Sequence, residues 1–108
     1  MLVFLHGYGT YCAKMGFIAE KFVKLGYDAI GFDYPGFGYS EGPRGHIDTD
    51  NLIETGLDFL KKANEYLENV YKSNSIKYIA YGYSTGAQLS ISLERTFQKT
   101  NGSEKKLF

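Results

Sequence analysis

The chain has 108 residues, enough for one ordinary domain, and its 44% hydrophobic content indicates a globular protein. Twelve basic residues balance twelve acidic ones, which argues against nucleic acid as a partner and against electrostatic attraction to an anionic membrane. The single cysteine, Cys12, excludes an intrachain disulfide and fits a reducing compartment.

Apolar patterning predicts the first half of the secondary structure. The continuous apolar run Leu2–Leu5 is typical of a strand buried on both faces. It is too short for a signal-peptide core or a membrane span, so we expect a cytoplasmic protein. Apolar residues at helical spacing predict a helix over 13–25, which Gly26 ends. A second short strand is expected over 28–32.

The second half continues the alternation. Asp48, Thr49 and Asp50 are N-cap candidates for a long helix that runs to about Tyr71. A third strand, rich in β-branched and aromatic residues, is expected over 76–83. The last helix begins at Ser84 or Thr85 and fades near Lys99.

The order β-α-β-α-β-α predicts an α/β fold with three parallel strands and helices on both faces of the sheet. Glycine-bearing loops at 6–9, 33–46 and 82–86 each leave the carboxyl end of a strand. These loops should therefore converge on one edge of the sheet, which is where such sheets bind ligands.

The third of these loops reads Gly82-Tyr83-Ser84-Thr85-Gly86, a G-x-S-x-G pattern between a strand and a helix. A turn this tight strains the serine backbone and leaves no room for side chains two residues away, so Gly82 and Gly86 are needed there. The hydroxyl of Ser84 would then stand clear as a nucleophile, with the following helix facing developing negative charge. The alternative is a glycine-rich turn with an incidental serine.

The first loop, His6-Gly7-Tyr8-Gly9, directly follows the first strand. Its glycines let the main chain approach a substrate, so the backbone N–H groups of Tyr8 and Thr85 are candidate oxyanion donors. By itself the loop would be a glycine turn with a structural histidine. We expect His6 to orient or pack the loop and not to carry protons.

The second loop, Asp33 to His46, holds both prolines of the chain. Asp33 is tempting as a catalytic acid, but it precedes the serine and lies in a turn-rich segment. We expect its carboxylate to accept hydrogen bonds from backbone amides of this loop.

Together, the segments "FLHGYG", "DYPGFGYSEGPRGHI" and "AYGYSTGAQ" resemble the α/β-hydrolase fold, and within it the monoglyceride lipase, lysophospholipase and serine aminopeptidase group. The resemblance covers Val3 to about Glu94. Two departures, Tyr83 where the lipases usually carry histidine and Ala87 where glycine often follows, leave the substrate open.

The resemblance implies that Ser84 is the nucleophile and that the amides of Tyr8 and Thr85 bind the oxyanion. It also implies a lipid-like ester substrate, such as a monoacylglycerol or lysophospholipid, with amides as an alternative. No metal or organic cofactor is implied. Peripheral membrane contact of the full-length protein stays open.

The partners of Ser84 are not where this family places them. The triad of this family runs in the order Ser, then Asp or Glu, then His. After Ser84 the acidic residues are Glu94 and Glu104, and no histidine follows. His46 precedes the serine in a substrate-side loop and is a poor substitute. We therefore expect residues 1–108 to be a single incomplete α/β-hydrolase domain, inactive alone, whose end at 105–108 looks like a strand that is cut off. A non-catalytic binding protein with this fold is the alternative.

In the family's sheet order, the first strand lies between the other two, so the strands at 28–32 and 76–83 would be unpaired edges. We expect the chain made alone to be poorly soluble or marginally folded. A cooperative thermal transition in a monodisperse monomer would contradict this.

Overall fold

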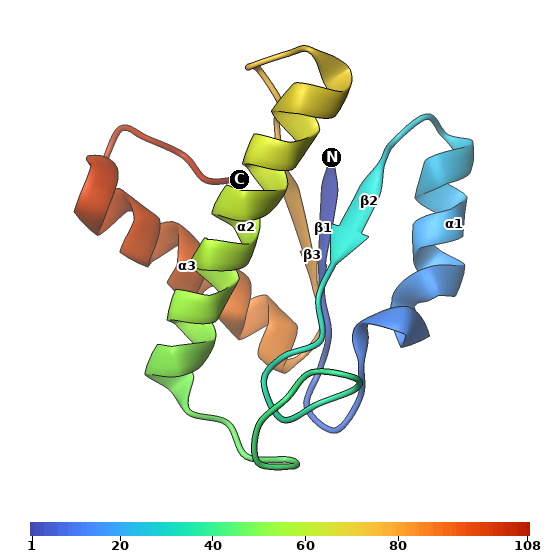
Figure 1. Cartoon of the computed structure of the whole chain (residues 1–108), viewed down its shortest axis with the longest axis vertical. Helices are drawn as coiled ribbons and strands as arrows, with labels where there is room; N and C mark the ends of the chain where they lie inside the picture. The colour runs from blue at the N-terminus through green and yellow to red at the C-terminus, as the bar shows by residue number, and fades with distance from the viewer.

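A three-stranded parallel sheet lies at the centre of the computed structural model, which describes residues 1–108 (Figure 1). β1 (Leu2–Leu5) is the middle strand and pairs in parallel with β2 (Ala29–Gly31) and β3 (Ile79–Gly82). The predicted parallel sheet and the central position of the first strand are confirmed. Because all three strands point the same way, their carboxyl ends share the lower edge in Figure 1.

Helices cover both faces of the sheet, as predicted. α1 (Gly16–Lys24) lies on one face and follows a 3-10 turn, η1 (Cys12–Met15), that occupies the start of the predicted helix. α2 (Thr49–Tyr71) and α3 (Thr85–Asn101) lie on the other face (Figure 1). The sheet is therefore the middle layer of three.

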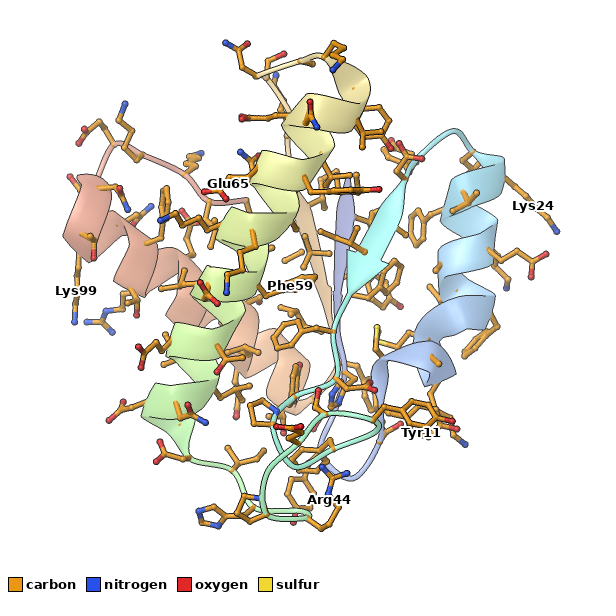
Figure 2. The ribbon with its side chains drawn as sticks, viewed as in Figure 1. Tyr11, Lys24, Arg44, Phe59, Glu65 and Lys99 are labelled. Atoms are coloured by element: carbon orange, nitrogen blue, oxygen red, sulfur yellow. The ribbon has the colours of Figure 1, made fainter.

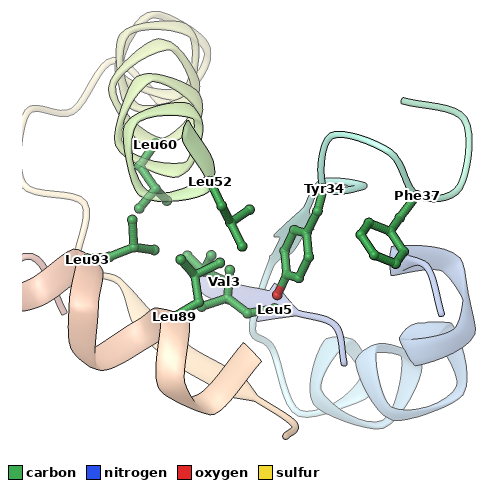
Figure 3. Close-up of a cluster of buried hydrophobic side chains, with 8 residues drawn as sticks. All are labelled: Val3, Leu5, Tyr34, Phe37, Leu52, Leu60, Leu89 and Leu93. Atoms are coloured by element: carbon green, nitrogen blue, oxygen red, sulfur yellow. The ribbon is translucent and has the colours of Figure 1, made fainter. Parts of the chain in front are cut away.

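The alternation of side chains along β1 builds one core on each face of the sheet. Val3 and Leu5 point toward α2 and α3, where they join the larger cluster of buried side chains drawn in Figure 3. Leu2 and Phe4 point toward α1 and pack with Met15. All four residues of β1 are buried, which explains its unbroken apolar run.

Local signals set the limits of α2. Asp48 is its N-cap, with the Oδ1 carboxylate oxygen accepting from the Asn51 N–H at 3.0 Å. At the other end Lys72 adopts a left-handed conformation (φ 53°), and its N–H donates to the Glu68 carbonyl. The sequence named Asp48 among three N-cap candidates and placed the end at Tyr71 correctly.

The outer strands are shorter than predicted because β1 has only four residues to pair with. The expected strand at 105–108 is absent: this segment is irregular. The N–H groups of Leu107 and Phe108 donate to the Glu94 carboxylate, at 3.0 and 2.9 Å to Oε2. Those amides are therefore bound to a side chain instead of a neighbouring strand.

Tyr34 carries the one buried side-chain oxygen without a hydrogen-bond partner, and its ring is 0% exposed. Burial raises the pKa of this hydroxyl, which keeps it neutral. We expect Tyr34→Phe to raise the free energy of unfolding by about 1–3 kcal/mol, because an unpaired buried hydroxyl is lost while the ring is kept. Urea denaturation of the protein expressed from its complete coding sequence measures the change.

Tyr78→Phe is the matched control. The Tyr78 hydroxyl donates to Asn64 Oδ1 at 2.7 Å, so its removal should lower stability by about 1 kcal/mol. Equal destabilisation by the two substitutions would show that the Tyr34 hydroxyl is not an energetic cost.

Candidate functional site

Ser84 lies in the turn between β3 and α3, at φ 54° and ψ −116°. Of the residues other than glycine, only Ser84 and Lys72 have positive φ. A serine in this region stores about 1–3 kcal/mol of strain. Its side chain is exposed and forms no hydrogen bond, not even to cap α3. The hydroxyl is therefore free and is presented at the carboxyl edge of the sheet.

The two glycines that flank Ser84 are required by the space around them. A Cβ atom on Gly82 would stand 2.5 Å from the carbonyl carbon and oxygen of Gly86. A Cβ on Gly86 would overlap the carbonyl oxygen of Leu5 in β1. The G-x-S-x-G spacing thus follows from close packing of the first turn of α3 onto both β3 and β1.

The 6–9 loop lies directly against this turn. The Tyr83 N–H donates to the Leu5 carbonyl at 3.2 Å, which continues the β1–β3 pairing past the strand end. A Cβ on Gly7 would stand 3.0 Å from the Tyr83 ring and 3.4 Å from the Tyr83 carbonyl oxygen. The structure therefore brings the His6–Gly9 and Gly82–Gly86 segments together, as the topology predicted.

Two backbone amides at this junction have no acceptor in the chain. The first four N–H groups of a helix lack intrahelical partners. In α3, three of the four donate to the carbonyls of Tyr83 and Ser84, and the Thr85 N–H does not. The Tyr8 N–H, in a residue that is 62% exposed, likewise donates to no group. These are the two amides that the sequence proposed as oxyanion donors.

His6 is fully buried and both of its ring nitrogens are engaged. Nδ1 lies 2.8 Å from the Gly7 carbonyl oxygen, which can only accept, so Nδ1 carries the hydrogen. Nε2 accepts from the Tyr34 N–H at 3.0 Å, and the His6 ring stacks on the Tyr34 ring at 3.6 Å. His6 therefore packs and orients the loop, in agreement with the sequence expectation.

Desolvation by burial lowers the pKa of His6 below its ordinary value of 6.5, against smaller opposing effects of the Gly7 carbonyl and Asp33. At pH values between the pKa of His6 in the folded chain and 6.5, His6 binds more protons in the unfolded chain than in the folded chain. The free energy of unfolding should therefore fall as the pH drops below about 6.5. The His46→Gln variant tests this expectation, because it leaves His6 as the single histidine. In an NMR titration of that variant, the His6 ring protons should show a midpoint below 6.5. A midpoint at or above 6.5 would contradict the lowered pKa.

Asp33 organises the 33–46 loop, as predicted. Its Oδ1 accepts from the Cys12 N–H at 2.7 Å and its Oδ2 from the Tyr39 N–H at 2.9 Å. The Ser40 hydroxyl donates to the Asp33 carbonyl at 2.5 Å. The carboxylate therefore accepts from one backbone amide at the start of η1 and one in the 33–46 loop, and neither oxygen bonds a histidine.

Two features of this loop escaped the sequence analysis. The Arg44 guanidinium donates to the Gly38 carbonyl at 2.9 Å and to the Ser40 carbonyl. The Tyr8 hydroxyl donates to the Gly45 carbonyl at 2.9 Å, which links the first and second loops. Figure 2 shows Arg44 and Tyr11 at the lower edge, where these loops gather. No periodicity or motif in the sequence predicts these contacts, because they depend on the path of the loop.

His46 is exposed at the end of the same loop, and no hydrogen bond joins it to Ser84. It borders a small cavity of about 240 Å³ together with Tyr34 and Leu52. A larger hollow of about 1070 Å³ lies between α2, α3 and the C-terminal segment, and Ser84 does not line it. We place the candidate site at Ser84 because the exposed hydroxyl and the two amides without acceptors lie at this edge of the sheet. The size of a cavity is not the criterion.

No three His, Cys, Asp or Glu side chains lie close enough together to hold a metal ion. None of the helices combines the length and apolarity needed to cross a bilayer.

Comparison with known proteins gives two matches. A family model described as serine aminopeptidase, S33, matches residues 1–101. The quorum-quenching protein AidA of Acinetobacter baumannii is 36% identical over 88 residues, which is 80% of this chain and 28% of the relative. The chain thus spans less than a third of that relative's length. No solved structure gives a significant match.

Proposed function

Because the chain belongs to the serine aminopeptidase S33 family of the α/β-hydrolase superfamily, we propose that Ser84 is the nucleophile of a hydrolase that cleaves carboxylic esters. The Ser84 Oγ attacks the ester carbonyl and forms an acyl-enzyme, which water then hydrolyses. The N–H groups of Tyr8 and Thr85 donate to the oxyanion that forms in each step.

One observation carries this proposal: a free, exposed serine hydroxyl on a strained strand-to-helix turn, beside two amides that lack acceptors. A nucleophile elbow needs these properties, since the strain lifts the hydroxyl away from the backbone. An incidental serine in a βα turn has no reason to adopt φ 54°.

The proton of Ser84 needs a base, and the two histidines of the chain do not supply one. The Nε2 lone pair of His6 is occupied by the Tyr34 N–H, and His46 forms no hydrogen bond with the serine. We propose that a histidine and its acid partner come from residues outside 1–108. The whole protein's activity would then require them.

Lipid-like esters are the substrate class we favour. The resemblance to monoglyceride lipases and lysophospholipases, carried by the 33–47 segment, supports monoacylglycerols or lysophospholipids. The family's description as a serine aminopeptidase supports amides as a second candidate. The name of the Acinetobacter relative adds quorum quenching as an activity to assay.

A direct test compares substrates on the protein expressed from its complete natural coding sequence. We expect release of fatty acid from a monoacylglycerol or a lysophosphatidylcholine, and little release of amine from an aminoacyl p-nitroanilide. Ser84→Ala should lower the rate by about 10³-fold or more. Ser103→Ala, an exposed serine without side-chain hydrogen bonds, is the matched control and should keep the full rate.

The alternatives give different results in the same assay. Faster cleavage of the anilide than of the esters would show that amides are the preferred substrate class. Binding of a fatty acid without turnover of any substrate would favour the non-catalytic binding protein.

A further inference from the structure

We propose that the Tyr8 side chain is a positioning residue that fixes the orientation of its own backbone N–H. This inference rests on the proposed function, in which that N–H donates to the oxyanion. It adds a role for the phenol hydroxyl, which is remote from the reacting atoms.

Apart from the hydrogen bond between His6 and the Gly7 carbonyl, few contacts hold the segment that carries this amide. Tyr8 lies between Gly7 and Gly9, and Gly9 has φ +72°, with no atom beyond its chain neighbours within 4 Å of the position a Cβ would take. Glycines on both sides allow the peptide planes to rotate. The exposed Tyr8 N–H itself forms no hydrogen bond, so within this peptide only the His6 bond to the Gly7 carbonyl opposes such rotation.

The Tyr8 side chain supplies the restraint. Its hydroxyl donates to the Gly45 carbonyl at 2.9 Å, and its ring meets the Phe37 ring edge-on at 5.4 Å between centroids. Both partners belong to the 33–46 loop, so the main chain at Tyr8 is tied across the edge of the sheet to a second loop.

That second loop is a firm anchor. Gly45 has φ +72°, and its N–H donates to the Gly36 carbonyl at 3.0 Å. The Asp33 carboxylate and the Arg44 guanidinium each bind two backbone groups of neighbouring segments. The Gly45 carbonyl is thus held in place independently of Tyr8.

The preceding residue is fixed to the same loop. The His6 Nδ1–H donates to the Gly7 carbonyl, and Nε2 accepts from the Tyr34 N–H. The peptide that ends in the Tyr8 N–H is therefore held on one side by His6 and on the other by the Tyr8 hydroxyl. An oxyanion donor that is oriented before the substrate arrives costs no reorganisation during the reaction.

The test measures inactivation by an alkyl fluorophosphonate in the protein expressed from its complete coding sequence. The Ser84 Oγ bonds to phosphorus, the P–F bond breaks, fluoride leaves, and the hydroxyl proton passes to the base. The phosphoryl oxygen takes the place of the oxyanion. We expect Tyr8→Phe to lower the limiting inactivation rate about tenfold and Tyr8→Ala about 100-fold. The reagent's dissociation constant should stay within about twofold, since the affected donor acts in the transition state.

Tyr39→Phe is the matched control, because Tyr39 is 100% exposed on the same loop and its hydroxyl has no partner. Its inactivation rate should equal that of the unmodified protein. Hydrogen exchange of the 6–10 backbone should rise in Tyr8→Phe and stay unchanged in Tyr39→Phe, with equal thermal midpoints for the two variants.

The outcomes separate this inference from the function on which it depends. An unmodified protein that is not labelled at Ser84 would overturn the proposed function and this role together. Labelling of the unmodified protein with an equal limiting rate in Tyr8→Phe would overturn only the role of the hydroxyl. A larger dissociation constant for the reagent in Tyr8→Phe, at an unchanged limiting rate, would show that Tyr8 acts in substrate binding. That result would also overturn the positioning role of the hydroxyl.

Discussion

In the protein expressed from its complete coding sequence, replacement of Gly86 by alanine is expected to prevent folding or to lower the free energy of unfolding by more than about 4 kcal/mol. The added Cβ would overlap the Leu5 carbonyl oxygen and stand 2.9 Å from that of His6. These atoms belong to the central strand and its exit, so they cannot move without breaking the sheet. Circular dichroism and urea denaturation measure the loss.

Gly16→Ala is the matched control, since it also places alanine in the first turn of a helix. Apart from its chain neighbours and the backbone of its own helix, no atom lies within 4 Å of the position a Cβ would take at Gly16. This variant should be more stable by about 0.5–1 kcal/mol, because alanine loses less backbone entropy than glycine. Equal stability of Gly86→Ala and Gly16→Ala would contradict the close packing of α3 onto β1.

The second large effect is expected at Asp33. Asp33→Ala removes the acceptor of two backbone N–H groups, one on a half-buried cysteine and one on an exposed tyrosine. We expect a loss of about 3 kcal/mol, since hydrogen bonds to a charged group contribute about 1.5–3 kcal/mol each and the exposed one contributes less. Urea denaturation at neutral pH measures it.

Asp58→Ala is the control for removal of a carboxylate. Asp58 pairs with Lys62 at 2.8 Å on the exposed face of α2, and such pairs contribute about 0.5 kcal/mol or less. If Asp33→Ala kept full stability but abolished hydrolysis by the complete protein, Asp33 would be the catalytic acid and our structural assignment would be wrong.

The sequence predicted the architecture well because burial on one face or both faces of an element sets the spacing of its apolar residues. The apolar run of β1, the helical spacing of α2 and the glycines at strand exits are consequences of where each residue lies in the three layers. The same topology argument predicted that the 6–9 and 82–86 segments lie side by side.

The parts that escaped prediction are set by single contacts. Nothing in the pattern distinguishes a Tyr8 hydroxyl that binds Gly45 from one that faces solvent. The segment at 105–108 has strand-like composition, but the Glu94 carboxylate takes its amides. The poor solubility expected from the open edges of β2 and β3 stays a prediction, to be checked by light scattering.

The most direct test of the whole account is the site of covalent modification. The protein expressed from its complete coding sequence is treated with a fluorophosphonate, and its proteolytic peptides are analysed by mass spectrometry. We predict one phosphonate adduct, on Ser84, and none in Ser84→Ala. An adduct on another residue, an adduct that persists in Ser84→Ala, or an unmodified Ser84 after prolonged treatment would contradict the assignment of Ser84 as the nucleophile.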